Sequence, residues 1–143
     1  MLLANVTTED ICYDLGCNDG RYCICAAKEY GARAVGIEIL PEAASKAQRA
    51  VMDEGVGHLV QILEGDLMET SVAEASVVFI YLLPRGMGEV AAKLERELQP
   101  GARVVTYLFS LPGHNPVKEI VVPVGRSSRE ESSFNKLRLY VMP

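Results

Sequence analysis

The sequence has no apolar run that approaches the length of about 20 residues needed to cross a membrane. Its opening residues, MLLAN, become polar too soon for the apolar core of a secretory signal peptide. Clusters of lysine and arginine are also scarce, and the formal net charge of the 143 residues is −5. Because a dedicated nucleic-acid binder needs a basic face to neutralise phosphates, this charge disfavours nucleic acid as a partner.

The four cysteines lack the spacing of a metal site. Cys23 and Cys25 lie two residues apart on a predicted helix, so their side chains point to nearly opposite sides. We interpret all four as small and mostly buried side chains in a reducing compartment, and we expect no bound metal. Cys17 lies in a glycine-containing loop and is the candidate for a reactive thiol.

Hydrophobic residues make up 49% of the chain, which indicates a folded globule, and short apolar segments alternate with helix-like ones. This alternation is typical of a parallel sheet with right-handed crossovers. We predict one domain over residues 1–143: an α/β, Rossmann-like three-layer sandwich with a mostly parallel seven-stranded sheet and a C-terminal antiparallel hairpin. The predicted strands are 11–15, 34–39, 59–63, 76–83, 102–109, 119–124 and 137–141, and the predicted helices are 21–30, 41–54 and 85–98.

The segment DLGCNDG follows the first predicted strand, where ligands bind in a doubly wound sheet. Gly16 and Gly20 allow a tight turn and a close approach of the backbone to a ligand. Glu38 ends the second predicted strand, where a carboxylate can accept two hydrogen bonds from a ribose diol. This arrangement predicts a nucleotide-like cofactor, either a dinucleotide or S-adenosylmethionine.

The identity of that cofactor depends on charge and on the glycine spacing. A dinucleotide fingerprint needs glycines at the first, third and sixth positions, but Asn18 and Arg21 stand at the last two. Asp14 would repel a pyrophosphate and suits the ammonium group of a methionine moiety. The sequence therefore favours S-adenosylmethionine over a nicotinamide dinucleotide, and a dehydrogenase is the weaker alternative.

Several segments of the chain resemble motifs of a known enzyme class. YDLGCNDGR, AVGIEI, EGD and LQPGARVV resemble the class I, seven-stranded S-adenosylmethionine-dependent methyltransferases. With VVFIYLLP and LQPGARVVTYLFSLPGHNP, the likeness extends to the archaeal protein-lysine methyltransferases and to the family acting on lysine of the ATP synthase c-subunit. It covers about residues 11–116 and implies S-adenosylmethionine as the cofactor, S-adenosylhomocysteine as its product, and a protein substrate.

The resemblance also implies roles for individual residues. Asp14 and the turn after it would hold the methionine part, Glu38 the ribose hydroxyls, and Asp66 the adenine amino group. Tyr81 and Leu82, the implied catalytic residues, would border the methyl donor and the entering amine. The implied cofactor site comprises Asp14, Gly16, Cys17, Asn18, Gly20, Glu38, Ile39, Asp66 and Leu67.

Three departures from the family pattern bear on these expectations. Asn18 stands where the family usually has glycine, and asparagine tolerates a positive φ better than other side chains do. His114 stands where the family usually has tryptophan. An N-terminal segment with a YVPT-like stretch is not found before the first strand. We therefore expect that the chain is truncated at its N-terminus, that a partner or a homo-oligomer covers the site, or that the site is open.

Structural alternatives remain open for most of these residues. Asp14 could brace its loop, Asp66 could form an Asx turn, and the aromatic residues Tyr81, Tyr107 and Phe109 could be ordinary core. We expect a cytoplasmic or mitochondrial protein-lysine N-methyltransferase. The alternatives are a non-catalytic Rossmann-like module and a methyltransferase acting on a small molecule or a nucleic acid, although the amide-methylating motif with two prolines and a tyrosine is missing after the fourth strand.

Overall fold

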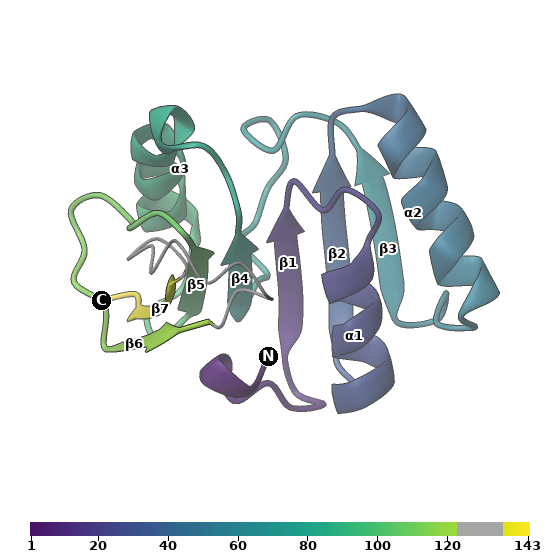
Figure 1. The fold of residues 1–143 in the computed structure, drawn as a ribbon, viewed down its shortest axis with the longest axis horizontal. Coiled ribbons are helices and arrows are strands. Elements are labelled where there is room, and N and C mark those ends of the chain that lie inside the picture. The colour runs from purple at the N-terminus through teal and green to yellow at the C-terminus, as the bar shows by residue number, and fades with distance from the viewer. Residues whose placement is uncertain (123–135) are drawn as a thin grey trace, which may run out of the picture.

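The computed structural model describes residues 1–122 and 136–143, so most of the polar loop predicted to join the last two strands lies outside the described residues. Seven strands form one sheet in the order β3-β2-β1-β4-β5-β7-β6 (Figure 1). In chain order the elements are η1 (Leu2–Ala4), β1 (Ile11–Leu15), α1 (Arg21–Tyr30), β2 (Arg33–Glu38), α2 (Pro41–Asp53), β3 (Val60–Glu64), β4 (Val77–Ile80), α3 (Pro84–Glu97), β5 (Arg103–Tyr107), β6 (Lys118–Val121) and β7 (Lys136–Val141).

Strand pairing is parallel from β3 to β5, and β7 then runs antiparallel to both β5 and β6. The predicted fold is confirmed, including the antiparallel pair at one edge. The chain leaves β1 toward β2 on one side and returns from β3 to β4 on the other. The strand order therefore reverses between β1 and β4, which is where an open α/β sheet forms a ligand-binding crevice at its carboxyl edge.

Helices cover both faces of the sheet and produce three layers. Helices α1 and α2 bury short side chains, among them Ala26 and Ala47, against the face that carries Ile62 and Val77. Helix α3 packs on the opposite face in a second core cluster, which includes Leu94. Figure 1 shows α1 crossing in front of β2. The alanines let α1 and α2 lie close to the sheet. This packing fixes the helix ends that the loops at the carboxyl edge join.

An ion-pair network fastens the first ten residues at the amino edge of the sheet. Asp10 is 6% exposed and accepts a hydrogen bond from the Ser76 hydroxyl at 2.7 Å. Arg103 pairs with the Asp10 carboxylate and donates to the carbonyl oxygen of Ala4. These contacts connect η1 to β4 and β5, and they lie at the end of the sheet opposite the predicted site.

The fourth and fifth strands end two or three residues earlier than the sequence indicated. The prediction ran through residue 83 in the fourth strand, but β4 ends at Ile80 because Pro84 begins α3 and the preceding Leu83 is its N-cap. The fifth strand was predicted to reach residue 109, but β5 ends at Tyr107 because Leu108 adopts a φ of 71°. Both corrections turn a predicted strand end into a loop at the carboxyl edge. In the parts of the chain that the structure describes, no helix has the length and apolar character of a membrane span.

Candidate functional site

The turn after β1 is built on left-handed backbone conformations. Gly16 and Gly20 both have a φ of 79°, and Asn18 has a φ of 49°. Asn18 thus adopts the left-handed conformation at the position where the family usually has glycine, which asparagine tolerates. The backbone N–H groups of Gly16 and Cys17 both donate to the carbonyl oxygen of Ile37 at 2.9 Å, which fixes the turn against the end of β2.

The carboxylate of Glu38 lies beneath this turn and is 7% exposed. It accepts hydrogen bonds from the backbone N–H groups of Asn18 at 3.0 Å and of Leu40 at 3.1 Å, one on each oxygen. A carboxylate has about four lone-pair sites, so these two bonds leave acceptor capacity. Glu38 thus stabilises the loop and can still accept bonds from hydroxyl groups of a ligand.

Asp14 lies one strand away from Glu38 and is 5% exposed. Its Oδ2 is buried without a hydrogen-bond partner among the described residues. Burial, together with the negative charges of Asp19 and Glu38, raises the pKa of Asp14 to about 7. The sequence alternative that Asp14 braces its loop has no support from this oxygen, whose surroundings suit a cationic ligand group.

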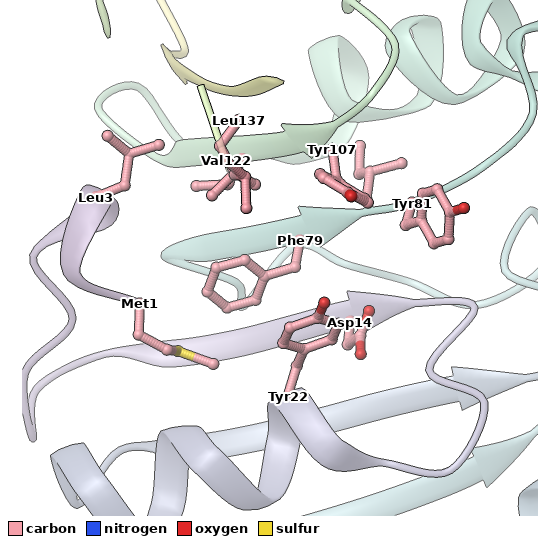
Figure 2. Close-up of a pocket in the computed structure, with 11 residues that line it drawn as sticks. Met1, Leu3, Asp14, Tyr22, Phe79, Tyr81, Tyr107, Val122 and Leu137 are labelled. Carbon is pink, nitrogen blue, oxygen red and sulfur yellow. The ribbon is translucent and has the colours of Figure 1, made fainter. Parts of the chain in front are cut away.

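A cleft of about 270 Å³ opens beside Asp14 on the α1 face of the sheet. Figure 2 shows Tyr22, from the first turn of α1, beside Asp14, with Phe79 next along the wall. The rings of Tyr22 and Phe79 stack with their centroids 6.5 Å apart, and those of Tyr81 and Tyr107 are tilted with centroids 5.1 Å apart. The cleft is lined by Met1, Leu3, Asp14, Tyr22, Phe79, Ile80, Tyr81, Val105, Tyr107, Val122 and Leu137.

The predicted catalytic residues lie where β4 ends. Tyr81 lines the cleft with its side chain 56% exposed. Leu82 reaches the cofactor turn, since a Cβ built on Gly16 would be 3.4 Å from Leu82 Cδ2. The loops after β1 and β4 therefore meet, as the sequence prediction requires. Phe109, the third aromatic residue considered from the sequence, is not among the residues that line the cleft.

The residues predicted to contact adenine lie after β2 and β3. Asp66 is exposed, and its Oδ1 accepts a hydrogen bond from the backbone N–H of Met68 at 2.9 Å, which is the Asx turn considered from the sequence. Ile39 is 62% exposed, and Leu67 packs on the core cluster beneath α3. Ile39 follows the end of β2, and Asp66 and Leu67 follow the end of β3, so all three lie at the same carboxyl edge of the sheet as Glu38. Their roles toward a ligand stay predictions.

The structure also places Cys17 and His114, two residues that the sequence analysis singled out. Cys17 is 3% exposed, and burial and the nearby charge of Asp14 raise the pKa of its thiol to about 12, so the prediction of a reactive thiol is wrong. Cys17 packs instead over Gly36. His114 lies 2.7 Å from the Glu95 carboxylate, with which it forms an exposed contact on α3.

Tyr22 and Phe79 contribute to the cleft but were not predicted. The position of Tyr22, in the first helical turn after a glycine loop, was the signal that could have identified it. Phe79 lies in a continuous apolar strand, where no pattern distinguishes a cleft residue from a core residue. Within residues 1–122 and 136–143, no group of three histidine, cysteine or acidic side chains is arranged to hold a metal ion.

Comparison with known proteins adds independent evidence. A family model described as the ANTKMT methyltransferase domain matches residues 14–118. A protein-lysine N-methyltransferase of Saccharolobus islandicus (strain REY15A) is 41% identical over 124 residues, which are 86% of this chain and 77% of that protein. The crystal structure of an RNA methyltransferase from Salinibacter ruber, in complex with S-adenosyl-L-homocysteine, matches 99% of this chain and 86% of its own with a TM-score of 0.89 and 35% identity.

A more distant relative is a lysine N-methyltransferase of Xenopus laevis that is named for the c-subunit of ATP synthase. It is 37% identical over 106 residues, which are 74% of this chain but only 46% of that protein. This chain therefore spans less than half of the length of that relative. The family match begins at Asp14 and includes the turn, Glu38, the residues after β3 and the cleft tyrosines. The chain belongs to the ANTKMT methyltransferase domain family.

Proposed function

We propose that this chain is an S-adenosylmethionine-dependent protein-lysine N-methyltransferase. The observation that carries the proposal is a buried carboxylate oxygen of Asp14 that has no hydrogen-bond partner among the described residues and lies beside a cleft with aromatic walls. Such an oxygen suits the cationic end of an amino acid, and the aromatic walls suit an amine. The relatives from Saccharolobus islandicus and Xenopus laevis, both named as lysine N-methyltransferases, support lysine as the acceptor.

The residues of the turn fit the methyl donor. Asp14 would meet the ammonium group, the backbone from Gly16 to Gly20 would approach the methionine part, and Glu38 would accept from the ribose hydroxyls. Asp66, Leu67 and Ile39 would border the adenine. S-adenosylmethionine supplies an electrophilic methyl group on a positively charged sulfur, so the protein needs no nucleophile of its own.

The protein's part in catalysis would be alignment. The acceptor amine must arrive neutral and in line with the methyl group, and such alignment is worth about 7–11 kcal/mol in favourable cases. Tyr81 and Tyr107 would border the amine with ring faces, and Leu82 would hold the loop after β4 against the turn. Because the walls of the cleft are mostly apolar and aromatic, a lysine side chain that enters loses water, which lowers the pKa of its ammonium group.

A protein acceptor and a reducing compartment complete the proposal. The net charge of −5 favours a basic protein segment over a polyanion as the partner. Cys12, Cys17, Cys23 and Cys25 are all free thiols, and the first three are buried, which supports the cytoplasm or the mitochondrial interior as the location.

The test is a methyl-transfer assay with labelled S-adenosylmethionine and separate pools of basic proteins, RNA and small amines. We expect label in protein, at lysine, and its loss in the Asp14→Ala and Tyr81→Ala variants. Label that appears only in RNA or only in small molecules would overturn the choice of acceptor. The Salinibacter ruber structure, named as an RNA methyltransferase, is the observation that favours RNA as the second candidate.

A non-catalytic module is the remaining alternative, and a binding measurement separates it from an enzyme. We expect S-adenosylhomocysteine to bind with an affinity that calorimetry can measure. Binding without transfer to any pool would indicate a module that recognises the cofactor without using it. Absence of binding at millimolar ligand would overturn the proposal as a whole.

A further inference from the structure

We propose that cofactor uptake is coupled to proton release from Asp14: part of the empty protein holds this carboxyl group as the neutral acid, and the ammonium group of the ligand selects the ionised form. The inference rests on the proposed function, because it takes the ligand to be S-adenosylmethionine or its product. Asp14 then favours ligands that carry a positive charge next to its carboxyl group. A ligand without such a charge gains no affinity from Asp14.

The position of Asp14 within the sheet removes most of its side chain from water. It pairs in register with Gly36 of β2 and with Phe79 of β4, and its side chain lies on the face covered by α1. At 5% exposure its Oδ2 has no partner among the described residues. A buried carboxylate in this state lacks the hydrogen bonds that would stabilise its charge.

Polar and titratable groups face Asp14 from β2, from the turn after β1 and from α1. Glu38 of β2 and Asp19 of the turn present negative charge to it, while α1 contributes Tyr22 and Cys23. The turn also contributes the Cys17 thiol, and the cleft beyond is bordered by the tyrosines of β5 and of the loop after β4.

The guanidinium group of Arg21 does not offset the negative charge that Glu38 and Asp19 present to Asp14. Arg21 is paired with the Asp19 carboxylate at 2.7 Å, and its side chain is 71% exposed to solvent. Burial and the two carboxylates together raise the pKa of Asp14 to about 7. The empty site therefore holds a mixture of the neutral acid and the ion at neutral pH.

A cation beside Oδ2 reverses this balance. On binding, the O–H bond of the carboxyl group breaks, the proton passes to the buffer, and the carboxylate accepts an N–H···O bond from the ligand ammonium. A pair of this kind favours the ionised form and lowers the pKa of the carboxyl group. With a starting pKa of about 7, the linkage relation gives about 0.9 proton released per bound ligand at pH 6, about 0.5 at pH 7 and about 0.1 at pH 8.

The test is titration calorimetry with S-adenosylhomocysteine at pH 6, 7 and 8, each in two buffers of different ionisation enthalpy. The difference in binding enthalpy between the buffers gives the number of protons released. We expect the count to fall as pH rises, and the affinity to increase about tenfold from pH 6 to pH 8. The ligand's own titration is removed by the same measurement on Asp14→Asn, which keeps the shape of the side chain but carries no proton to release.

A second ligand and a matched variant sharpen the result. We expect 5′-methylthioadenosine, which lacks the amino-acid tail, to bind without proton release. Glu64→Gln removes an exposed carboxyl group at the position paired with Glu38 across the β2–β3 register, and its proton count should equal that of the unmodified protein. In the unmodified protein, carbon NMR of labelled aspartate should show one carboxyl group that titrates near pH 7 and stops doing so when S-adenosylhomocysteine is bound.

The outcomes separate the inference from the function on which it depends. Binding of S-adenosylhomocysteine with no buffer dependence at any pH, or equal proton release in Asp14→Asn, would overturn the inference and leave the proposed function intact. Absence of binding would overturn both.

Discussion

The carboxylate of Glu38 and the backbone N–H of Asn18 are joined by a hydrogen bond of 3.0 Å across the carboxyl ends of β2 and β1. The acid predicted to hold the ribose therefore also holds the loop predicted to hold the methionine part. A second bond, from the N–H of Leu40 at 3.1 Å, fixes the other oxygen. Binding and local stability depend on the same carboxylate, so changes at Glu38 affect both.

We expect Glu38→Gln to lower the free energy of unfolding by about 1–3 kcal/mol, because the amide nitrogen of glutamine cannot accept a hydrogen bond and one backbone N–H loses its partner. Affinity for S-adenosylhomocysteine should fall as well, since the turn is less well fixed. Urea denaturation and titration calorimetry measure the two effects.

The control for Glu38 is its neighbour across the strand pair. Glu64→Gln changes an exposed acid at the same level of the sheet and should alter stability by no more than about 0.5 kcal/mol. Equal losses in the two variants would show that the loss reflects general surface charge, and the bracing role of Glu38 would be wrong.

The segment from β1 to α1 was predicted to the residue because its signals are local. A short apolar strand, glycines that adopt positive φ at both ends of the helix, and an amphipathic pattern all agree. The placement of Asp14 near Glu38 also followed from the sequence, since carboxyl ends of neighbouring parallel strands meet at one edge. The sequence did not predict which of the two acids is hydrogen-bonded and which has a raised pKa, because hydrogen-bond partners and burial arise from tertiary packing.

The same distinction explains the residues that sequence analysis missed or misjudged. Cys17 was the candidate for a reactive thiol because it lies in a glycine-containing loop, but Gly36 leaves space for it on β2 and the thiol is buried there. Tyr22 lines the cleft because the turn places the first helical turn of α1 next to Asp14. Leu108 ends β5 through a backbone conformation that leucine rarely adopts, so no propensity rule would have located the strand end there.

Stability should depend on pH through Asp14 in a predictable direction. The folded-state pKa of about 7 lies above the ordinary value of 3.8, so the folded protein binds this proton more tightly than the unfolded chain does. The contribution of Asp14 to stability is therefore fully present below the unfolded value and is lost as pH rises through the folded value.

We expect the difference in the free energy of unfolding between Asp14→Asn and the unmodified protein to increase by about 3 kcal/mol from pH 5 to pH 8, in favour of the variant. Urea unfolding at pH 5, 6, 7 and 8 without ligand measures the difference. Parallel pH profiles for the two proteins would mean that Asp14 keeps an ordinary pKa in the folded state.

The contact between Cys17 and Gly36 leads to a prediction about the turn. A Cβ on Gly36 would lie 2.7 Å from Cys17 Sγ and 2.9 Å from Ile62 Cδ1, so alanine forces the turn or β3 to move. Gly36→Ala should lower stability by about 1–3 kcal/mol through overpacking and should weaken binding of S-adenosylhomocysteine.

Two further variants test the cause of that loss. Adding Cys17→Ala to Gly36→Ala removes the sulfur and should recover at least about 0.5 kcal/mol as a coupling energy. Gly57→Ala places a Cβ where no heavy atom lies within 4 Å and should leave stability unchanged or slightly higher. If Gly57→Ala proves as harmful as Gly36→Ala, backbone freedom and not the sulfur contact determines the loss.

Tyr81 should affect catalysis more than stability. Its ring is 56% exposed and lies 5.1 Å from the ring of Tyr107, so its removal opens the cleft without emptying the core. We expect Tyr81→Ala to lower kcat/KM by up to about 100-fold through misalignment of the acceptor amine, with a change in the free energy of unfolding of no more than about 1 kcal/mol.

Tyr81→Phe keeps the ring and should retain most of the activity if the ring face borders the amine. Steady-state methyl transfer to the protein acceptor measures the first effect and urea denaturation the second. Full activity in Tyr81→Ala would remove this residue from the site, whereas equal losses in the alanine and phenylalanine variants would assign the role to the hydroxyl group instead of the ring.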